Sequence, residues 1–178
     1  PTAQKQIFTI NDIPNKYIQF SQEEPRGFGY WWWLSFLYKK LSSETKENEI
    51  IIWSDARSGF TDSKTRQLVR NIKKIQWLNI FLNDTKKDMC VWQMENHLEQ
   101  EWTTLDMLNH FGYNLKSDEA TTGQFTNHFL TFRNNHKTRL FFEDFYNFSI
   151  DNKNLWLPKE YNLVNHPNFV EPRWLQSL

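Results

Sequence analysis

The feature that most constrains the fold of this chain is an apolar run, Ile50-Ile51-Ile52-Trp53, that comes shortly before a carboxylate at Asp55. Consecutive β-branched and aromatic side chains are typical of a strand that is buried on both faces. In open α/β sheets, ligands bind outside the carboxyl ends of such strands. We therefore expect a buried strand over residues 49–53, with Asp55 placed where a nucleotide or a metal ion would bind.

Length and charge limit the possible classes of protein. The chain has 178 residues, enough for one domain with a real core, and its 21 Lys and Arg residues balance 21 Asp and Glu residues. A neutral chain lacks the basic groove that accompanies nucleic-acid stacking platforms, so we expect no nucleic-acid partner. No stretch is apolar for long enough to span a bilayer, and the single Cys90 cannot form an internal disulfide. These features predict a soluble, cytoplasmic protein.

Strand and helix patterns alternate along the chain. The expected strands cover residues 6–10, 49–53, 89–93 and 125–132, and the expected helices cover residues 30–41, 63–74, 103–112 and 135–146. Repeated crossovers between strands favour an α/β sheet over a β-sandwich, and residues 1–178 are expected to form one domain.

Several short motifs occur in an order that resembles one family of sugar transferases. Residues 27–31 match a Gly-(Tyr/Phe)-Gly-Tyr-Trp block, and residues 52–56 match a strand ending in the Asp of a DxD-like motif. Residues 101–106 resemble a Trp-Thr segment that leads into a helix, and residues 122–124 resemble a Gln-centred motif. Residues 173–177 fall where that family often carries Arg-His-Asp-Gln-Ser. In this collinear order the chain resembles the GT-A type nucleotide-sugar glycosyltransferases of bacterial capsule, lipopolysaccharide and large-virus glycan synthesis.

The resemblance implies a fold and an activity. The fold would be a mixed, mostly parallel sheet flanked by helices. Because only one expected strand, residues 6–10, precedes the Gly-Tyr-Trp block, we interpret the chain as trimmed at its ends or as a minimal version of that fold. The activity would be transfer of a hexose from a nucleotide-sugar donor, expected to be a uridine diphosphate sugar, onto a growing surface glycan.

The resemblance also implies a divalent cation, Mn²⁺ or Mg²⁺, that bridges a carboxylate and the donor phosphates. Asp55 is the expected anchor, and the alternative is an Asp that caps the turn after its strand. Position 57 carries Arg57 in place of a second carboxylate; its guanidinium could contact phosphate directly, or the residue could lie on the surface. His166 is the candidate for a replacement metal ligand, against the alternative of a surface loop histidine.

Other residues are candidates for contacts with the donor. Gly27 would let the backbone approach a ligand, and Tyr30 and Trp31 would stack on a base or sugar; the alternative is a turn followed by a helix with core aromatics. Trp102 lies beside Glu101 in the Trp-Thr segment, and both are expected to contact the sugar. For Glu101 the alternative is a solvated acidic surface.

The amide of Gln124 suits sugar hydroxyls, and the alternative is an ordinary loop residue. Near the end of the chain, Glu171, Arg173 and Gln176 are the candidate catalytic residues, and a surface ion pair is the alternative for the first two. Trp174 and Leu175 stand where the family often has His and Asp. A second hypothesis is therefore a carbohydrate- or nucleotide-sugar-binding relative that has lost turnover.

Overall fold

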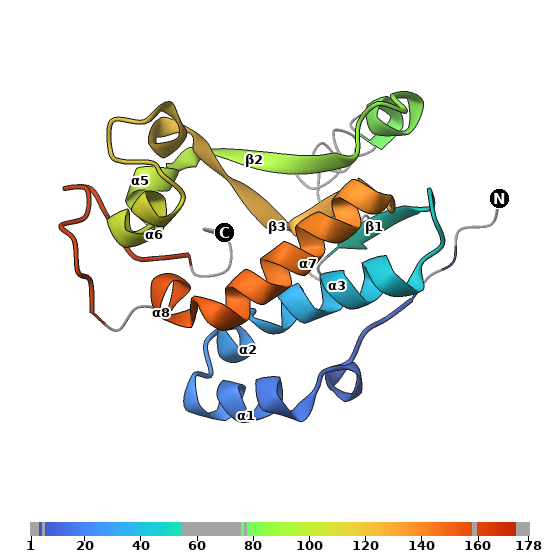
Figure 1. Ribbon diagram of the computed structural model, residues 1–178, viewed down its shortest axis with the longest axis horizontal. Helices are drawn as coiled ribbons and strands as arrows, with labels where there is room; N and C mark the ends of the chain where they lie inside the picture. Colours follow the sequence, from blue (N-terminus) through green and yellow to red (C-terminus); the bar gives the residue numbers. More distant parts are fainter. Residues whose placement is uncertain (1–3, 5, 55–75, 77, 158–159, 174–178) are drawn as a thin grey trace, which may run out of the picture.

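The computed structural model describes residues 4, 6–54, 76, 78–157 and 160–173 (Figure 1). Its elements in chain order are η1 (Ile10–Asp12), α1 (Asn15–Glu23), α2 (Gly27–Tyr30), α3 (Trp33–Glu44), β1 (Ile50–Ser54), β2 (Met89–Leu98), α5 (Glu99–Trp102), α6 (Leu105–His110), η3 (Asp118–Thr121), β3 (Gly123–Arg133), α7 (His136–Asp151) and α8 (Lys153–Trp156).

The described strands form an antiparallel sheet in the order β1-β3-β2. Strand β1 pairs with β3 from Ile50 opposite Arg133 to Ser54 opposite Phe129. Strand β2 pairs with β3 from Met89 opposite Phe132 to Leu98 opposite Gly123, and register shifts interrupt the pairing after Val91 and after Met94. The expectation of a mostly parallel, GT-A like sheet is therefore wrong, because β1 and β2 both run antiparallel to β3.

The connection between β2 and β3 explains why the direction differs from the sequence-based expectation. The helices α5, α6 and η3 lie between the end of β2 and the start of β3, and these two strand ends are adjacent. Glu99 N–H, just after β2, donates to Thr122 O, just before β3, at 2.9 Å. Gly123 permits this closure, because a Cβ atom there would lie 2.4 Å from Met94 O. A helical pattern between two strands is compatible with a parallel crossover, but here the helical connection joins two neighbouring antiparallel strands, β2 and β3.

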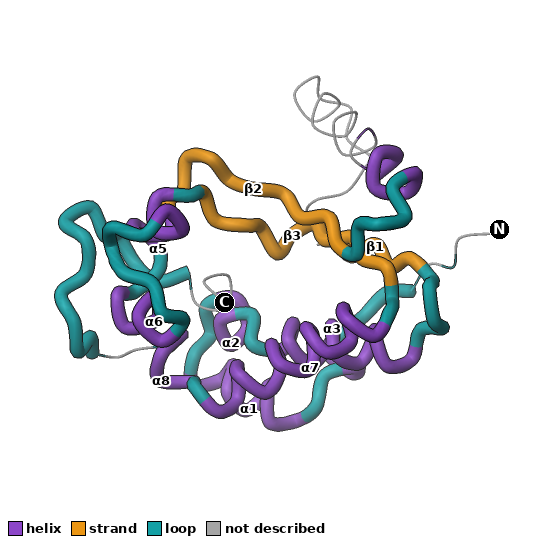
Figure 2. The backbone as a smooth tube through the Cα atoms, turned by 45° about the horizontal axis from the view of Figure 1, so that its top comes forward, coloured by secondary structure: helices purple, strands orange, loops and turns teal. Residues whose placement is uncertain are grey.

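Helices α3 and α7 pack side by side against one face of the sheet (Figures 1 and 2). Leu34 and Tyr38 of α3 and Phe142 of α7 form a buried cluster with Leu130 and Phe132 of β3. The rings of Phe132 and Phe142 have centroids 4.5 Å apart, and Phe132 is 0% exposed. This cluster is the core that joins the helical layer to the sheet.

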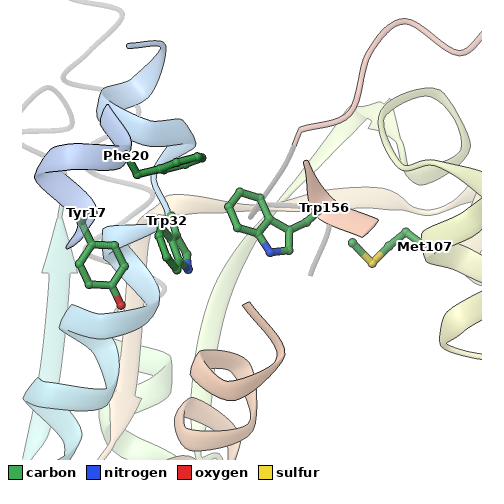
Figure 3. Packing of buried hydrophobic residues seen from close by; sticks show 5 residues of the cluster. All are labelled: Tyr17, Phe20, Trp32, Met107 and Trp156. Atoms are coloured by element: carbon green, nitrogen blue, oxygen red, sulfur yellow. The ribbon is translucent and has the colours of Figure 1, made fainter. Parts of the chain in front are cut away.

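A second cluster joins the helices to one another (Figure 3). It contains Tyr17 and Phe20 of α1, Trp32, Met107 of α6 and Trp156 of α8, and Trp156 lies between Trp32 and Met107. The two indoles are also satisfied as donors. Trp32 Nε1 donates to Ser149 Oγ at 3.2 Å and Trp156 Nε1 donates to Ser149 O at 2.9 Å.

Most expected elements are confirmed with different limits. The strands expected over 49–53, 89–93 and 125–132 correspond to β1, β2 and β3, and the helix expected over 135–146 extends to Asp151 as α7. The expectation that the first of these strands is buried on both faces is wrong, because Ile52 is 46% exposed and the other residues of β1 are only partly buried. Asn135 caps α7 by accepting from Thr138 N–H. The helix expected over 63–74 lies outside the described residues.

Two expectations at the amino-terminal end are corrected. The strand expected over residues 6–10 does not form: Ile10 begins η1, Ile7 is 71% exposed, and Phe8 contacts the sheet through its ring, whose centroid lies 6.3 Å from that of Trp53. The helix expected over 30–41 is α3, which begins only at Trp33, because the φ angles at residues 27–31, including Tyr30 and Trp31, are positive.

The helix expected from Thr103 begins one residue later than its sequence pattern indicates. Thr104 is the residue that caps α6, and its side chain accepts from Met107 N–H at 3.2 Å. Asp106, in the first turn of α6, accepts from Leu163 N–H at 3.2 Å.

Among the helices of the described part of the chain, none has the length and the apolar character needed to cross a lipid bilayer.

We predict that Phe132→Ala lowers the free energy of unfolding by about 3–5 kcal/mol, because it leaves a cavity between β3 and α7. Urea unfolding followed by circular dichroism measures this difference. Phe125→Ala is the matched control on the same strand, since Phe125 is 52% exposed; it should cost about 1 kcal/mol or less. Equal costs for the two variants would contradict the assignment of Phe132 to the core.

Candidate functional site

The carboxyl-terminal segment, residues 160–173, runs along α5 and α6 (Figure 1). Val170 N–H donates to Glu101 O at 2.9 Å, and Arg173 N–H donates to Trp102 O at 2.9 Å. The expected catalytic segment around residue 173 therefore lies directly against the expected sugar-binding pair. We call the region formed by α5, Thr103, Gln124 and residues 170–173 the α5 site.

An arginine and a tryptophan stack within the α5 site. The guanidinium carbon of Arg173 lies 4.4 Å from the centroid of the Trp102 ring, and its Nη1 lies 3.9 Å from Met94 Sδ. The ring of His97 approaches the same indole, with centroids 5.4 Å apart. Burial lowers the pKa of Arg173, yet a guanidinium stays protonated in proteins. The α5 site therefore holds a cation in a fixed orientation on an aromatic surface.

A bidentate ion pair connects the carboxyl-terminal segment to the start of α2. Arg26 Nη1 donates to Glu171 Oε2 at 3.0 Å, and Nη2 donates to Oε1 at 2.6 Å. The hydrogen bonds from Arg26 hold the pKa of Glu171 below its ordinary value. Because Arg26 directly precedes Gly27, this pair brings the expected donor-binding block beside the expected catalytic residues.

Backbone strain is concentrated in that donor-binding block. The φ angles at residues 27–31 are all positive, from 51° at Tyr30 to 79° at Gly29. Left-handed backbone is costly for residues with a Cβ, here Phe28, Tyr30 and Trp31, and such strain often occurs at functional sites.

The ring of Trp31 covers Gly27. A Cβ atom at Gly27 would lie 2.4 Å from Trp31 Cε3, so a ligand approaching Gly27 from this side would meet the indole.

Burial is the main cause that raises the pKa of Tyr30, and Glu24 adds to the effect.

Gln124 forms a polar network with Glu99, the first residue of α5, and with Thr103. Gln124 is 0% exposed, and its Nε2 donates to Glu99 Oε2 at 3.0 Å and to Thr103 Oγ1 at 3.1 Å. The Thr103 hydroxyl in turn donates to Glu99 Oε2. Burial raises the pKa of Glu99, and the hydrogen bonds from Thr103 and Gln124 oppose part of this shift. Gln124 thus contacts a carboxylate of the protein itself.

Sequence reasoning did not identify Glu99, Thr103 or Arg26 as site residues. Thr103 directly follows Trp102, and Arg26 directly precedes the Gly-Phe-Gly block, so their positions beside candidate residues could have indicated a role in the site. Glu99 belongs to an acidic stretch that predicts a solvated surface, and it is distinguished from its neighbours only by burial in the fold.

Of the two expected metal ligands, His166 is the one that the described part of the structure contains. His166 Nδ1 accepts from Asn168 N–H at 3.1 Å within its own loop. Asp55, Arg57 and Gln176 lie outside the described residues, so their roles stay predictions. Within the described ranges, no group of three or more His, Cys, Asp or Glu side chains is arranged to hold a metal ion.

No family model, curated protein or solved structure matches this chain.

We predict that Arg26 and Glu171 couple weakly, and that the coupling disappears in acid. The exposed side chains, 51% and 38%, limit the coupling to about 0.2–1 kcal/mol at about pH 7. The folded-state pKa of Glu171 is lowered, so its contribution is complete above the unfolded-state pKa and is lost as pH falls through the folded-state value.

A double-mutant cycle of Arg26→Met and Glu171→Gln, measured by urea unfolding at about pH 7 and about pH 3, tests this prediction. A coupling free energy that is the same at both values of pH would contradict it.

Proposed function

We propose that this chain is a glycosyltransferase that moves a hexose from a uridine diphosphate sugar to a surface glycan acceptor. The observation that carries the proposal is the convergence of three segments that are far apart in the sequence. Arg26 pairs with Glu171, and Arg173 stacks on Trp102, so the expected donor-binding, sugar-binding and catalytic segments adjoin one another.

The chemistry of transfer gives the α5 site a role. When a nucleoside diphosphate leaves the sugar, its phosphate oxygens carry negative charge that must be offset. A guanidinium forms paired hydrogen bonds with phosphate oxygens, and Arg173 is a partly buried guanidinium already oriented by Trp102. Orientation before the reaction lowers the cost of reorganisation in the transition state.

A divalent cation, Mn²⁺ or Mg²⁺, belongs to the proposal on sequence grounds. Asp55 is its proposed anchor and His166 its second proposed ligand. Because Asp55 lies outside the described residues, no step that we propose for this chain passes through the ion. A cytoplasmic location is part of the same proposal.

The second candidate function is nucleotide-sugar binding without turnover. The observation that favours it is the pair Trp174 and Leu175 in the positions where the related motif often has His and Asp. Donor binding is common to both candidates, whereas turnover distinguishes them.

We predict that a uridine diphosphate sugar with Mn²⁺ stabilises the chain. A ligand present at a hundredfold excess over its Kd adds about 2.7 kcal/mol, which corresponds to a Tm increase of about 5–10 °C for a protein of this size. A thermal-shift screen of nucleotide sugars, with and without Mn²⁺, measures the effect. No shift with any nucleotide sugar at millimolar concentration would contradict both candidates.

We also predict that Arg173→Gln weakens binding of the nucleotide sugar by about 10- to 100-fold, the equivalent of one charge-assisted hydrogen-bonding group. Calorimetric titration with the donor selected by the screen measures the loss. Arg139→Gln removes the same charge at a distant position on α7, where Arg139 pairs with Glu47 at 2.7 Å, and it should bind as the parent does. Equal weakening by the two variants would indicate a nonspecific charge effect.

A further inference from the structure

The carboxylate of Glu99 is fixed through one of its two oxygens. Thr103 and Gln124, 2% and 0% exposed, both donate to Oε2. In the part of the chain that the structure describes, no hydrogen bond reaches Oε1, and Glu99 as a whole is only partly buried. The network therefore orients the carboxylate and leaves Oε1 for a group from outside the protein.

A purely structural role does not require a charge at this position. A glutamine would accept the same hydrogen bonds through its carbonyl oxygen, without the cost of burying a carboxylate. Burial also raises the pKa of Glu99, which makes its carboxylate a stronger base near neutral pH. Both considerations favour a role in chemistry.

The position of Glu99 suits that role. Glu99 begins α5 and Trp102 ends it, and Arg173 stacks on Trp102. Helix α5 therefore carries the carboxylate of Glu99 and also Trp102, on which Arg173 stacks. Arg173 is the cation proposed to contact the departing diphosphate.

We infer that Glu99 is the acceptor-side general base of the proposed transfer, and that Thr103 and Gln124 are its positioning residues. In this step the acceptor hydroxyl oxygen forms a bond with the anomeric carbon, and its proton passes to Glu99 Oε1. The bond from the anomeric carbon to the phosphate oxygen breaks, and its electron pair leaves with the nucleoside diphosphate. This inference rests on the proposed function, and as a single displacement it implies inversion at the anomeric carbon.

The test compares the unmodified chain with Glu99→Gln. Release of uridine diphosphate from the donor selected by the thermal-shift screen is measured with methyl glucoside and methyl galactoside as acceptors. We expect kcat to fall by about 10²- to 10⁴-fold, while Tm and donor affinity stay close to those of the parent, because glutamine preserves the hydrogen bonds to Thr103 and Gln124. Glu119→Gln is the matched control: Glu119 is an exposed acid on η3, which packs against α5, and this variant should keep the parent kcat.

The pH profile supplies a measurement that a structural role would not change. In the parent, kcat should rise as Glu99 ionises. Thr103→Val removes a hydrogen-bond donor to the carboxylate, so the pKa of Glu99 should rise and the increase of kcat with pH should shift to higher pH. Thr103→Ser keeps the hydroxyl and should give the parent pH profile. Other titratable or charged groups on the elements that pack against α5 include Glu95 and His97 of β2, Asp118 and Glu119 of η3, Glu171 and Arg173 of the carboxyl-terminal segment, and Glu101 of α5 itself.

The outcomes separate this inference from the proposed function. A Glu99→Gln variant with the parent kcat, or a product with retained configuration, would overturn the assignment of Glu99 and leave the transferase proposal intact. An unmodified chain that transfers from none of the donors would overturn the transferase proposal, and the assignment of Glu99 with it. If Glu99→Gln fails to fold, the Thr103→Val and Thr103→Ser profiles decide the question, and identical profiles would overturn the assignment.

Discussion

The antiparallel pairing of β3 with both β1 and β2 is the constraint on which the rest of the structure depends. At the carboxyl end of β3, Phe132 and Leu130 pack against α3 and α7. At its other end, Gly123 lies so close to β2 that only glycine fits, and the next residue is the buried Gln124. One strand thus connects the core to the α5 site, and a change in its register would alter both.

Two kinds of polar contact hold the α5 site, and their energies differ. The Arg26–Glu171 pair is exposed, so water screens it and it contributes about 1 kcal/mol or less. The network of Glu99, Thr103 and Gln124 is buried, and leaving one of its groups unsatisfied would cost about 1–3 kcal/mol. The buried network therefore contributes more to the position of α5 than the ion pair contributes to the position of the carboxyl-terminal segment, which backbone hydrogen bonds from Val170 and Arg173 also hold.

The sequence predicts the elements of this fold better than their arrangement. The β-branched run at Ile50–Trp53 and the capped aromatic helix after Asn135 have strong local patterns, and both elements form where expected. The sequence does not determine strand direction, because alternating strand and helix patterns are compatible both with parallel crossovers and with the long connection that joins the antiparallel strands β2 and β3. For residues 6–10 the apolar pattern was present, but Ile7 is 71% exposed in the fold and no strand forms there.

The same distinction applies to the site. Motif order selected Trp102, Gln124, Glu171 and Arg173, and these residues gather in one region of the fold. Motif order could not distinguish Glu99 from Glu101, because both belong to one acidic stretch and only burial by Thr103 and Gln124 separates them. Residues selected by burial and hydrogen bonding in three dimensions are not visible in a single sequence.

Amide hydrogen exchange of the 178-residue chain, with and without a uridine diphosphate sugar and Mn²⁺, tests most directly whether the α5 site is where the donor binds. We expect bound donor to slow amide exchange in residues 99–104 and 170–173. Exchange in α7 should change little, because α7 packs against Leu130 and Phe132 at the end of β3 that lies away from the α5 site. Donor binding with protection confined to other segments, and none at residues 99–104 or 170–173, would contradict the assignment of the donor to the α5 site.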